Sequence, residues 1–203
     1  MRSFAPLRMT SLYDAPHLAP RPANDVPLSP VSFVERAGEV FADREAIVHG
    51  ARRSTWAETL ERSRRLAAAL RALGIGRGST VSTLLLNTPE MVEAHHAVPA
   101  LNAVLNTLNT RLDPPLLAWQ LAHCRSEVLL ADRELSATAR EAVELLRETH
   151  GRTITVVDVC DSEWQGAGER IGAHEYEAWI AAHDPLPRLA GPRAERDAIA
   201  VSY

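Results

Sequence analysis

The sequence predicts an α/β fold: a mostly parallel, doubly wound sheet with helices on both faces. Short runs of β-branched and leucine residues alternate along the chain with longer stretches of helical periodicity. The short runs are apolar on both faces, which is typical of parallel strands covered by helices from either side. With 203 residues, 46% of them hydrophobic, the chain can also bury a sizeable core.

The N-terminal residues predict an extended arm rather than regular structure. Residues 1–30 include six prolines, at positions 6, 16, 20, 22, 27 and 30. Because proline lacks the amide N–H that helices and sheets require, we expect this arm to lie over a domain formed by residues 31–203. Arg2 and Arg8, with no acid before Asp14, faintly resemble an organelle transit segment, and a true start at Met9 is the alternative.

The first elements of the domain follow from local patterns. Ser32–Phe41 places apolar residues on one helical face and predicts a short amphipathic helix. Ala46–His49 and the segment around Ser54 predict a two-stranded hairpin that turns at residues 50–53. Thr55 and Glu58 form a capping box that starts the next helix, which ends at Gly74.

Strands and helices then alternate. Thr80–Leu86 predicts a strand, and Thr88-Pro89-Glu90 supplies an N-cap, a first-turn proline and an acid for the helix that follows. Asp158–Gly172 is polar and predicts a surface excursion, and residues 197–203 predict a buried strand. The remaining predicted elements are the strands Val104–Asn106, Val128–Ala131 and Thr153–Val157 and the helices Pro114–Cys124, Ser136–Thr149 and Tyr176–Ala182.

Composition excludes several classes of function. A net charge of −4 gives no support for nucleic-acid binding. All 22 basic residues are arginines, so the chain supplies no Schiff-base lysine and no Walker-type lysine. Cys124 and Cys160 lie far apart without CxxC spacing, which predicts a reducing, cytoplasmic location and no metal site. No apolar run is long enough for a transmembrane helix.

Two motifs that suggest chemistry have simpler explanations, and a third is missing. The glycines at 74, 76 and 78 leave a helix and enter a strand, whereas a phosphate-binding loop runs from a strand into a helix. His95-His96 has no second ligand pair, so we expect one ring to pack and the other to be solvated. A GxSxG nucleophile elbow is absent.

Two polar segments directly follow predicted strands. These are Asn87-Thr88 and Asn106–Thr110, at the carboxyl edge of the sheet where α/β proteins bind ligands. Capping and turn formation also explain asparagine and threonine at such positions. Both interpretations, ligand binding and turn formation, stay open for these residues.

Several short segments, taken in their order along the chain, resemble the AMP-forming acyl-adenylate family, in its fatty acyl-CoA ligase branch. Residues 54–58 (STWAE) look like the family's first core motif, and residues 104–113 (VLNTLNTRLD) cover the second. Four further segments are similar to the family: 22–30 (PANDVPLSP), 87–95 (NTPEMVEAH), 128–132 (VLLAD) and 197–203 (DAIAVSY). Asn102 stands where the family usually has glycine, and Leu86 replaces a common proline.

The resemblance implies a ligase that activates a fatty or other carboxylic acid. ATP and Mg²⁺ would give an acyl-AMP, and coenzyme A would then accept the acyl group. The family's phosphate loop, ATP-binding aspartate and lid lysine lie beyond the strand at which this chain ends. The resemblance therefore assigns no catalytic, cofactor-binding or metal residue here, and the expectation is an N-terminal fragment that is inactive alone.

Three alternatives stay open at this stage. The chain is either such a fragment, a non-catalytic α/β binding or structural module, or one half of a split ligase. A homodimer and a missing C-terminal portion are the macromolecular partners that the resemblance leaves open.

Overall fold

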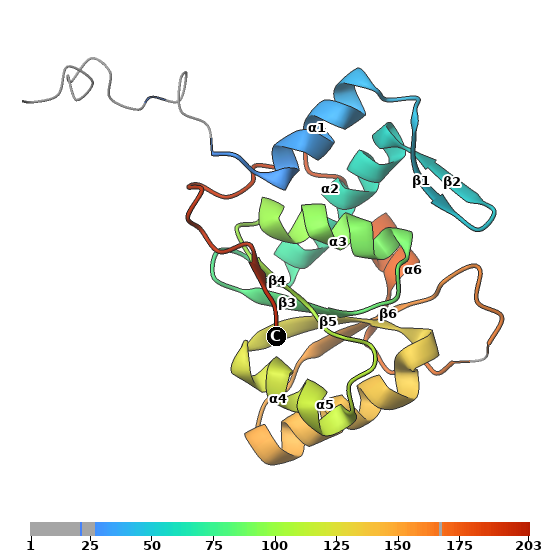
Figure 1. Cartoon of the computed structure of the whole chain (residues 1–203), viewed down its shortest axis with the longest axis vertical. Coiled ribbons are helices and arrows are strands. Elements are labelled where there is room, and N and C mark those ends of the chain that lie inside the picture. The colour runs from blue at the N-terminus through green and yellow to red at the C-terminus, as the bar shows by residue number, and fades with distance from the viewer. Residues whose placement is uncertain (1–20, 22–26, 167) are drawn as a thin grey trace, which may run out of the picture.

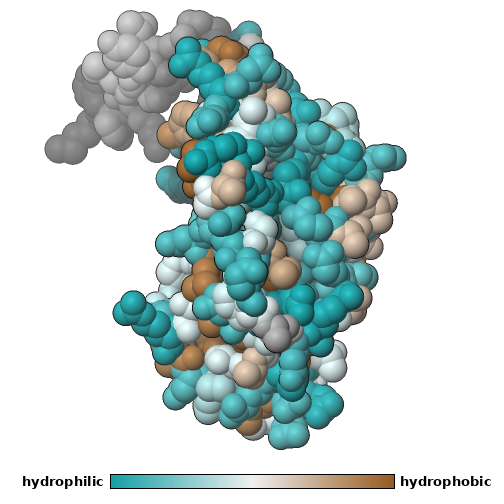
Figure 2. Space-filling model, turned by 90° about the vertical axis from the view of Figure 1, so that its right-hand side faces the viewer, coloured by the Kyte–Doolittle hydropathy of each residue, from teal (hydrophilic) through white to brown (hydrophobic). Residues whose placement is uncertain are grey.

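The computed structural model describes residues 21, 27–166 and 168–203. Almost all of the arm predicted for residues 1–30 therefore lies outside the described residues. The rest forms a parallel sheet with helices on both faces, which confirms the predicted α/β class (Figure 1). On the side that carries the hairpin, hydrophilic residues dominate the surface and hydrophobic ones form small separate patches (Figure 2).

The central sheet has six strands in the order β7-β6-β5-β3-β4-β8. Every pair of neighbours is parallel. Of these six strands β3 comes first in the sequence, and it lies inside the sheet between β4 and β5, as in a doubly wound fold. The strands are β3 (Thr80–Leu84), β4 (Val104–Thr107), β5 (Ser126–Asp132), β6 (Thr155–Val159), β7 (His174–Glu175) and β8 (Ala200–Val201).

Two helical layers cover the sheet, and each buries its own core. Helices α2 (Trp56–Ala72), α3 (Pro89–Ala100) and α6 (Tyr176–Ala181) lie on one face, and α4 (Pro114–His123) and α5 (Ser136–His150) on the other (Figure 1). Successive residues of one strand serve the two cores. Leu130 packs with the α2–α3 side and Leu129 with the α4–α5 side.

A hairpin and a short helix stand outside the sheet. Strands β1 (Glu45–His49) and β2 (Arg52–Thr55) pair only with each other, as predicted, while α1 (Pro30–Val40) packs on α2 and α3. The predicted capping box starts α2. Glu58 N donates to Thr55 Oγ1 at 3.2 Å, and Thr55 N donates to Glu58 Oε2 at 2.8 Å.

The glycines after α2 form a helix stop and a turn, as predicted. Gly74 and Gly78 have φ values of 87° and 84°, which side chains with a Cβ rarely adopt. Asn102 also lies in the left-handed region, with φ of 57°, at the position where the family usually has glycine. Asparagine is among the residues that tolerate this conformation best.

Hydrogen bonds offset the strain at Asn102. With its amide nitrogen turned toward Asp197, the side chain donates to Asp197 Oδ2 at 3.3 Å and accepts from Arg77 Nε at 3.3 Å. Arg77 and Asp197 also pair directly at 3.2 Å. Asn102 thus connects the turn before β3 to the segment that leads into β8.

Several predictions about individual segments were wrong. Thr88 does not cap α3 with its side chain: its hydroxyl is buried with no hydrogen-bond partner among the described residues, and its carbonyl accepts from Met91 N. Asp158 belongs to β6 and is buried, so the surface excursion begins after it. Only Ala200–Val201 of the final segment is a strand, at the edge of the sheet beside β4. The short strand β7 has too few residues to give a sequence pattern.

Candidate functional site

The carboxyl edge of the sheet is the first candidate site. Helix α3 follows β3 on one face of the sheet and α5 follows β5 on the other, so the chain diverges between these neighbouring strands. A topological switch of this kind opens a crevice in which doubly wound proteins bind ligands. The polar residues that follow β3 and that end β5 are therefore the candidates for ligand contacts at this edge.

The structure does not gather the predicted edge residues into one site. Asn87 is exposed, whereas Thr88 is buried beneath it. Asn106 is fully buried within β4 and donates to Ser82 Oγ at 2.9 Å, so it joins two strands instead of facing solvent. Asn109 accepts from Arg111 N at 3.0 Å in a local turn. A turn explains Asn109, whereas the Thr88 hydroxyl and Asn106 Oδ1 are buried without a hydrogen-bond partner among the described residues.

Asp132 at the end of β5 was missed by the sequence reasoning. Its side chain is 0% exposed, and Oδ1 accepts from Glu134 N at 3.0 Å. Burial raises the pKa of Asp132 above the usual value, although hydrogen bonds from the backbone amides of Glu134 and Leu86 lower it in part. Its Oδ2 and the Thr88 hydroxyl are buried without a hydrogen-bond partner among the described residues.

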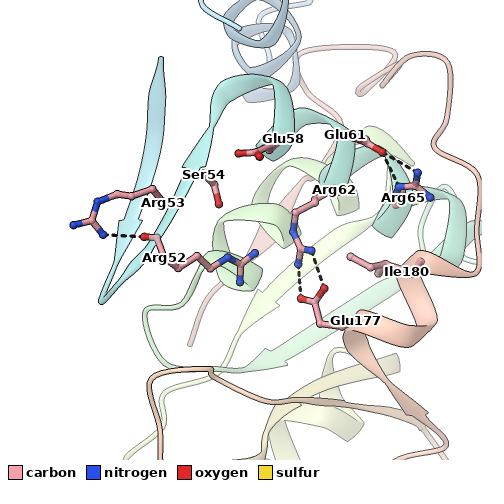
Figure 3. A pocket seen from close by; sticks show the side chains of 10 residues that line it. Arg52, Arg53, Ser54, Glu58, Glu61, Arg62, Arg65, Glu177 and Ile180 are labelled. Carbon is pink, nitrogen blue, oxygen red and sulfur yellow. Dashed lines mark hydrogen bonds and ion pairs between the residues drawn. The ribbon is translucent and has the colours of Figure 1, made fainter. Parts of the chain in front are cut away.

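The second candidate is a cavity of about 540 Å³ between β2, α2 and α6, here called the arginine cavity. Figure 3 shows guanidinium and carboxylate groups from these elements meeting across it. Arg62 points toward Glu177, and Arg65 toward Glu61 one turn earlier on α2. The polar side chains that line it are Arg52, Arg53, Ser54, Glu58, Glu61, Arg62, Arg65 and Glu177.

An ion-pair network lies behind this cavity. Arg62 Nε donates to Glu93 Oε1 at 2.6 Å, and its two terminal nitrogens donate to Glu177 at 2.8 and 2.6 Å. Tyr176 Oη donates to Glu93 Oε2 at 2.6 Å, and both of these side chains are buried. The network thus joins α2, α3 and α6.

The pKa values follow from burial and pairing. Burial raises the pKa of Glu93 above the usual value, with Arg62 opposing it. Burial also opposes the charge of Arg62, but hydrogen bonds with Glu177 and Glu93 raise its pKa overall. Burial, and then the Glu93 charge, raises the pKa of Tyr176 well above 10.

This pairing decides what the arginine cavity can do. Arg62 pairs with Glu177 across the cavity, Arg65 pairs with Glu61 on its own helix, and Arg52 pairs with Glu90 at 2.8 Å. Their charges are therefore matched by glutamates of the same chain, and a triphosphate would have to displace existing ion pairs. The cavity is a structural junction. The signal that the sequence reasoning missed was the two glutamates spaced i, i+3 on α3.

The paired histidines divide as predicted into one packed and one solvated ring. His95 is exposed and bonds back to Met91 O, whereas His96 is partly buried against α1. Burial, and then the neighbouring His95, lowers the pKa of His96 to about 4. No three His, Cys, Asp or Glu side chains in the described part of the chain could hold a metal ion.

We expect His96 to make the fold sensitive to mild acid. Its pKa is about 4 in the folded state and about 6.5 when unfolded, so its stability contribution is complete above pH 6.5 and is lost as the pH falls toward 4. Urea unfolding at pH 7 and pH 5 should show a loss of about 2 kcal/mol. His96→Gln should abolish most of this loss. The exposed neighbour is the control, because equal behaviour of His95→Gln would contradict the assignment.

None of the described helices is long and apolar enough to cross a membrane.

Comparison with known proteins identifies the family. The family model described as AMP-binding enzyme matches residues 34–202, which is most of the chain. The chain belongs to the AMP-binding enzyme family. The resemblance inferred from the core motifs is thereby confirmed.

Several curated relatives of this family member are CoA ligases by name. The peroxisomal acetate/butyrate–CoA ligase AAE7 of Arabidopsis thaliana is 38% identical over 96% of this chain and 35% of its own length. The peroxisomal benzoate–CoA ligase of the same plant is 37% identical over 89% of this chain and 32% of its own. The chain therefore spans about a third of the length of the relatives it matches.

Solved structures of CoA ligases share the fold. An anthranilate CoA ligase in complex with anthranoyl-AMP superposes with a TM-score of 0.73 at 24% identity, over 87% of this chain and 32% of that one. A benzoate CoA ligase from Burkholderia xenovorans gives 0.67 at 21% identity, over 80% and 30%.

Proposed function

We propose that this chain forms the N-terminal part of an acyl-CoA ligase that joins a carboxylic acid to coenzyme A with ATP. The observation that carries the proposal is 38% identity to an acetate/butyrate–CoA ligase across 96% of the chain. In that role the chain supplies about a third of the length of such a ligase. Its described residues provide neither a metal cluster nor a lysine, so we assign no step with ATP, Mg²⁺ or coenzyme A to them.

We propose a short aliphatic or aromatic acid as the substrate class. The support comes from the names of the relatives, which specify acetate, butyrate and benzoate, and trans-cinnamate for a Petunia hybrida ligase that is 44% identical over 63% of this chain. The sequence motifs pointed to the fatty acyl branch, so longer acids belong in the same assay.

A chimera tests the proposal. This chain replaces the region that it matches in the Arabidopsis acetate/butyrate–CoA ligase, and product formation is measured with acetate, butyrate, benzoate and a long-chain acid. We expect CoA ester with at least one acid, because this chain matches that region of the ligase along 96% of its own length. The 203-residue chain alone should catalyse no ATP–pyrophosphate exchange. A folded but inactive chimera, or exchange by the chain alone, would contradict the proposal.

We also propose a cytosolic location, on the basis of the two free cysteines in the described part of the chain, Cys124 and Cys160. The three relatives named above are all peroxisomal by name. Fluorescence microscopy of the tagged chain separates the two compartments.

A further inference from the structure

The β1–β2 hairpin contributes nothing to the two hydrophobic cores. No residue between positions 45 and 55 belongs to either core, and Ser54 is the one buried residue among them. The strands pair only with each other, and a two-stranded hairpin is marginally stable in water unless another element packs on it. Segments with few buried apolar contacts open locally at a lower free energy than the core. Polar contacts therefore decide whether the hairpin stays in place.

The base of the hairpin is fixed to α2. Trp56 N donates to Arg44 O at 3.0 Å, which joins the residue before β1 to the first residue of α2. Directly beyond this base, the pairing register of β1 with β2 shifts between Glu45 and Ile47. An irregularity of this kind interrupts the ladder and lets a strand bend. The hairpin thus has one fixed end with a bend next to it.

The tip of the hairpin is held by the turn that follows β6. His49 Nε2 forms a hydrogen bond with Asp161 Oδ1 at 2.8 Å, and Ala51 N donates to Glu163 Oε1 at 3.1 Å. Glu163 N donates to Asp161 Oδ1 at 2.9 Å, so the turn presents both carboxylates in one arrangement. The two segments fit closely, because a Cβ on Gly50 would collide with the Glu163 carboxylate. Figure 1 shows the loop after β6 beside the hairpin.

A third contact holds the hairpin to the start of α3. Arg52 Nη1 donates to Glu90 Oε1 at 2.8 Å, and Glu90 lies two residues after Thr88 at the carboxyl edge of the sheet. The turn after β6 leaves the sheet at the same edge, directly after Val159, which is the pairing partner of Asp132. Because β5 lies between β3 and β6, the hairpin tip reaches across the end of β5. These three interactions, with Asp161, Glu163 and Glu90, are here called the latch contacts.

We propose that the hairpin is a flap over the carboxyl edge of the sheet, closed in this structure by the latch contacts. It opens about its base without unfolding of the sheet, and its opening uncovers the crevice between β3 and β5. The side chains of His49 and Arg52 are 22% and 27% exposed, so water can replace their partners as the flap leaves. Doubly wound proteins bind ligands in this crevice, so the closed flap restricts access to it. The inference uses contacts of this chain alone and does not depend on the proposed function.

Hydrogen exchange of the 203-residue chain tests the flap. Backbone amides of residues 45–55 should exchange roughly 100-fold or more faster than those of β3 and β5, because flap opening leaves the sheet intact. His49→Ala removes one latch contact, so it should speed the exchange of the hairpin by about tenfold and leave β3 and β5 unchanged. Val48→Ala is the matched control, because Val48 is the neighbouring residue on β1, is 59% exposed and makes no latch contact. It should change the exchange by about threefold at most.

A thiol at position 88 reports on the crevice itself. Thr88 is 3% exposed, so the cysteine of a Thr88→Cys variant should react slowly with a thiol reagent while the flap is closed. Adding His49→Ala should raise its labelling rate by about tenfold, and Asp161→Ala, which breaks the same contact from the other side, should raise it at least as much. Mass spectrometry of the peptide that contains position 88 separates this reaction from labelling of Cys124 and Cys160.

Three results would overturn the proposal. The first is exchange of the hairpin as slow as that of β3, which would mean that the hairpin opens only when the sheet unfolds. The second is an equal effect of His49→Ala and Val48→Ala on the exchange of the hairpin. The third is a labelling rate at position 88 that does not respond to His49→Ala. Hydrogen exchange requires no substitution at Thr88, so the first two results decide the matter even if Thr88→Cys fails to fold.

Discussion

Replacing Arg62 with alanine is expected to cost about 3 kcal/mol of folding free energy, because it removes the nearer cation from the buried Glu93 carboxylate and leaves Arg52 at 3.8 Å. Arg62 is the residue that holds α2 to both α3 and α6. Its removal also leaves the half-exposed Glu177 without this ion pair. Urea unfolding of the chain at pH 7 measures the effect, and a cost of this size is a large share of a typical domain stability of about 5–15 kcal/mol.

Arg65→Ala is the matched control, three residues along the same helix and lining the same cavity. Its carboxylate partner Glu61 is exposed, and its other hydrogen bond goes to the neutral carbonyl of His183, so no buried charge loses its counter-charge and we expect a cost of about 1 kcal/mol. Equal costs for the two variants would show that the buried pair has no special weight.

The pH dependence of the Arg62 variant gives an independent check. Burial raises the pKa of Glu93, and Arg62 is the main group that opposes this rise. In the variant the folded state therefore binds a proton more tightly than the unfolded state, whose pKa is about 4.5, and stability falls as the pH rises above that value. The loss of unfolding free energy relative to the unsubstituted chain should therefore be smaller at pH 5 than at pH 7. Adding Glu93→Gln to the Arg62→Ala variant should recover part of this loss.

The second large effect is expected at Asp158, where alanine should cost about 3 kcal/mol. The buried carboxylate accepts from Ile171 N at 3.1 Å and from Gly172 N at 3.0 and 3.1 Å. Hydrogen bonds to a charged group contribute about 1.5–3 kcal/mol, and the substitution leaves two backbone amides without an acceptor. These bonds fix the point at which the 160–172 excursion returns to the sheet.

Asp158→Asn keeps one acceptor oxygen and should lose about half as much stability. Ser162→Ala, within the excursion and exposed, serves as the surface control. Thermal unfolding of the three variants should show the largest loss for Asp158→Ala, a smaller loss for Asp158→Asn and the smallest for the control. If Asp158→Ala matched Ser162→Ala, the carboxylate would have no role in anchoring the segment.

The sequence predicted those features that depend on neighbours along the chain. The Thr55–Glu58 capping box and the helix stop at Gly74 were both found where their local patterns placed them. Each is a contact within a few residues, and the alternation of apolar runs with helical periodicity likewise needs no distant partner to be recognised. The family resemblance, confirmed over residues 34–202, came from the order of such short segments.

Contacts between distant residues were decided by the tertiary structure alone. Arg62 pairs with Glu93 and Glu177, which lie 31 and 115 residues away in the sequence. Asp158 was predicted to lie in a surface segment, but it is buried and accepts a hydrogen bond from Ile171 N. Nothing in a local pattern distinguishes a glutamate that will be buried beside arginine from one that faces water. The packing of α3 against α2 makes that distinction, because it removes the carboxylate from solvent and leaves the guanidinium as its counter-charge.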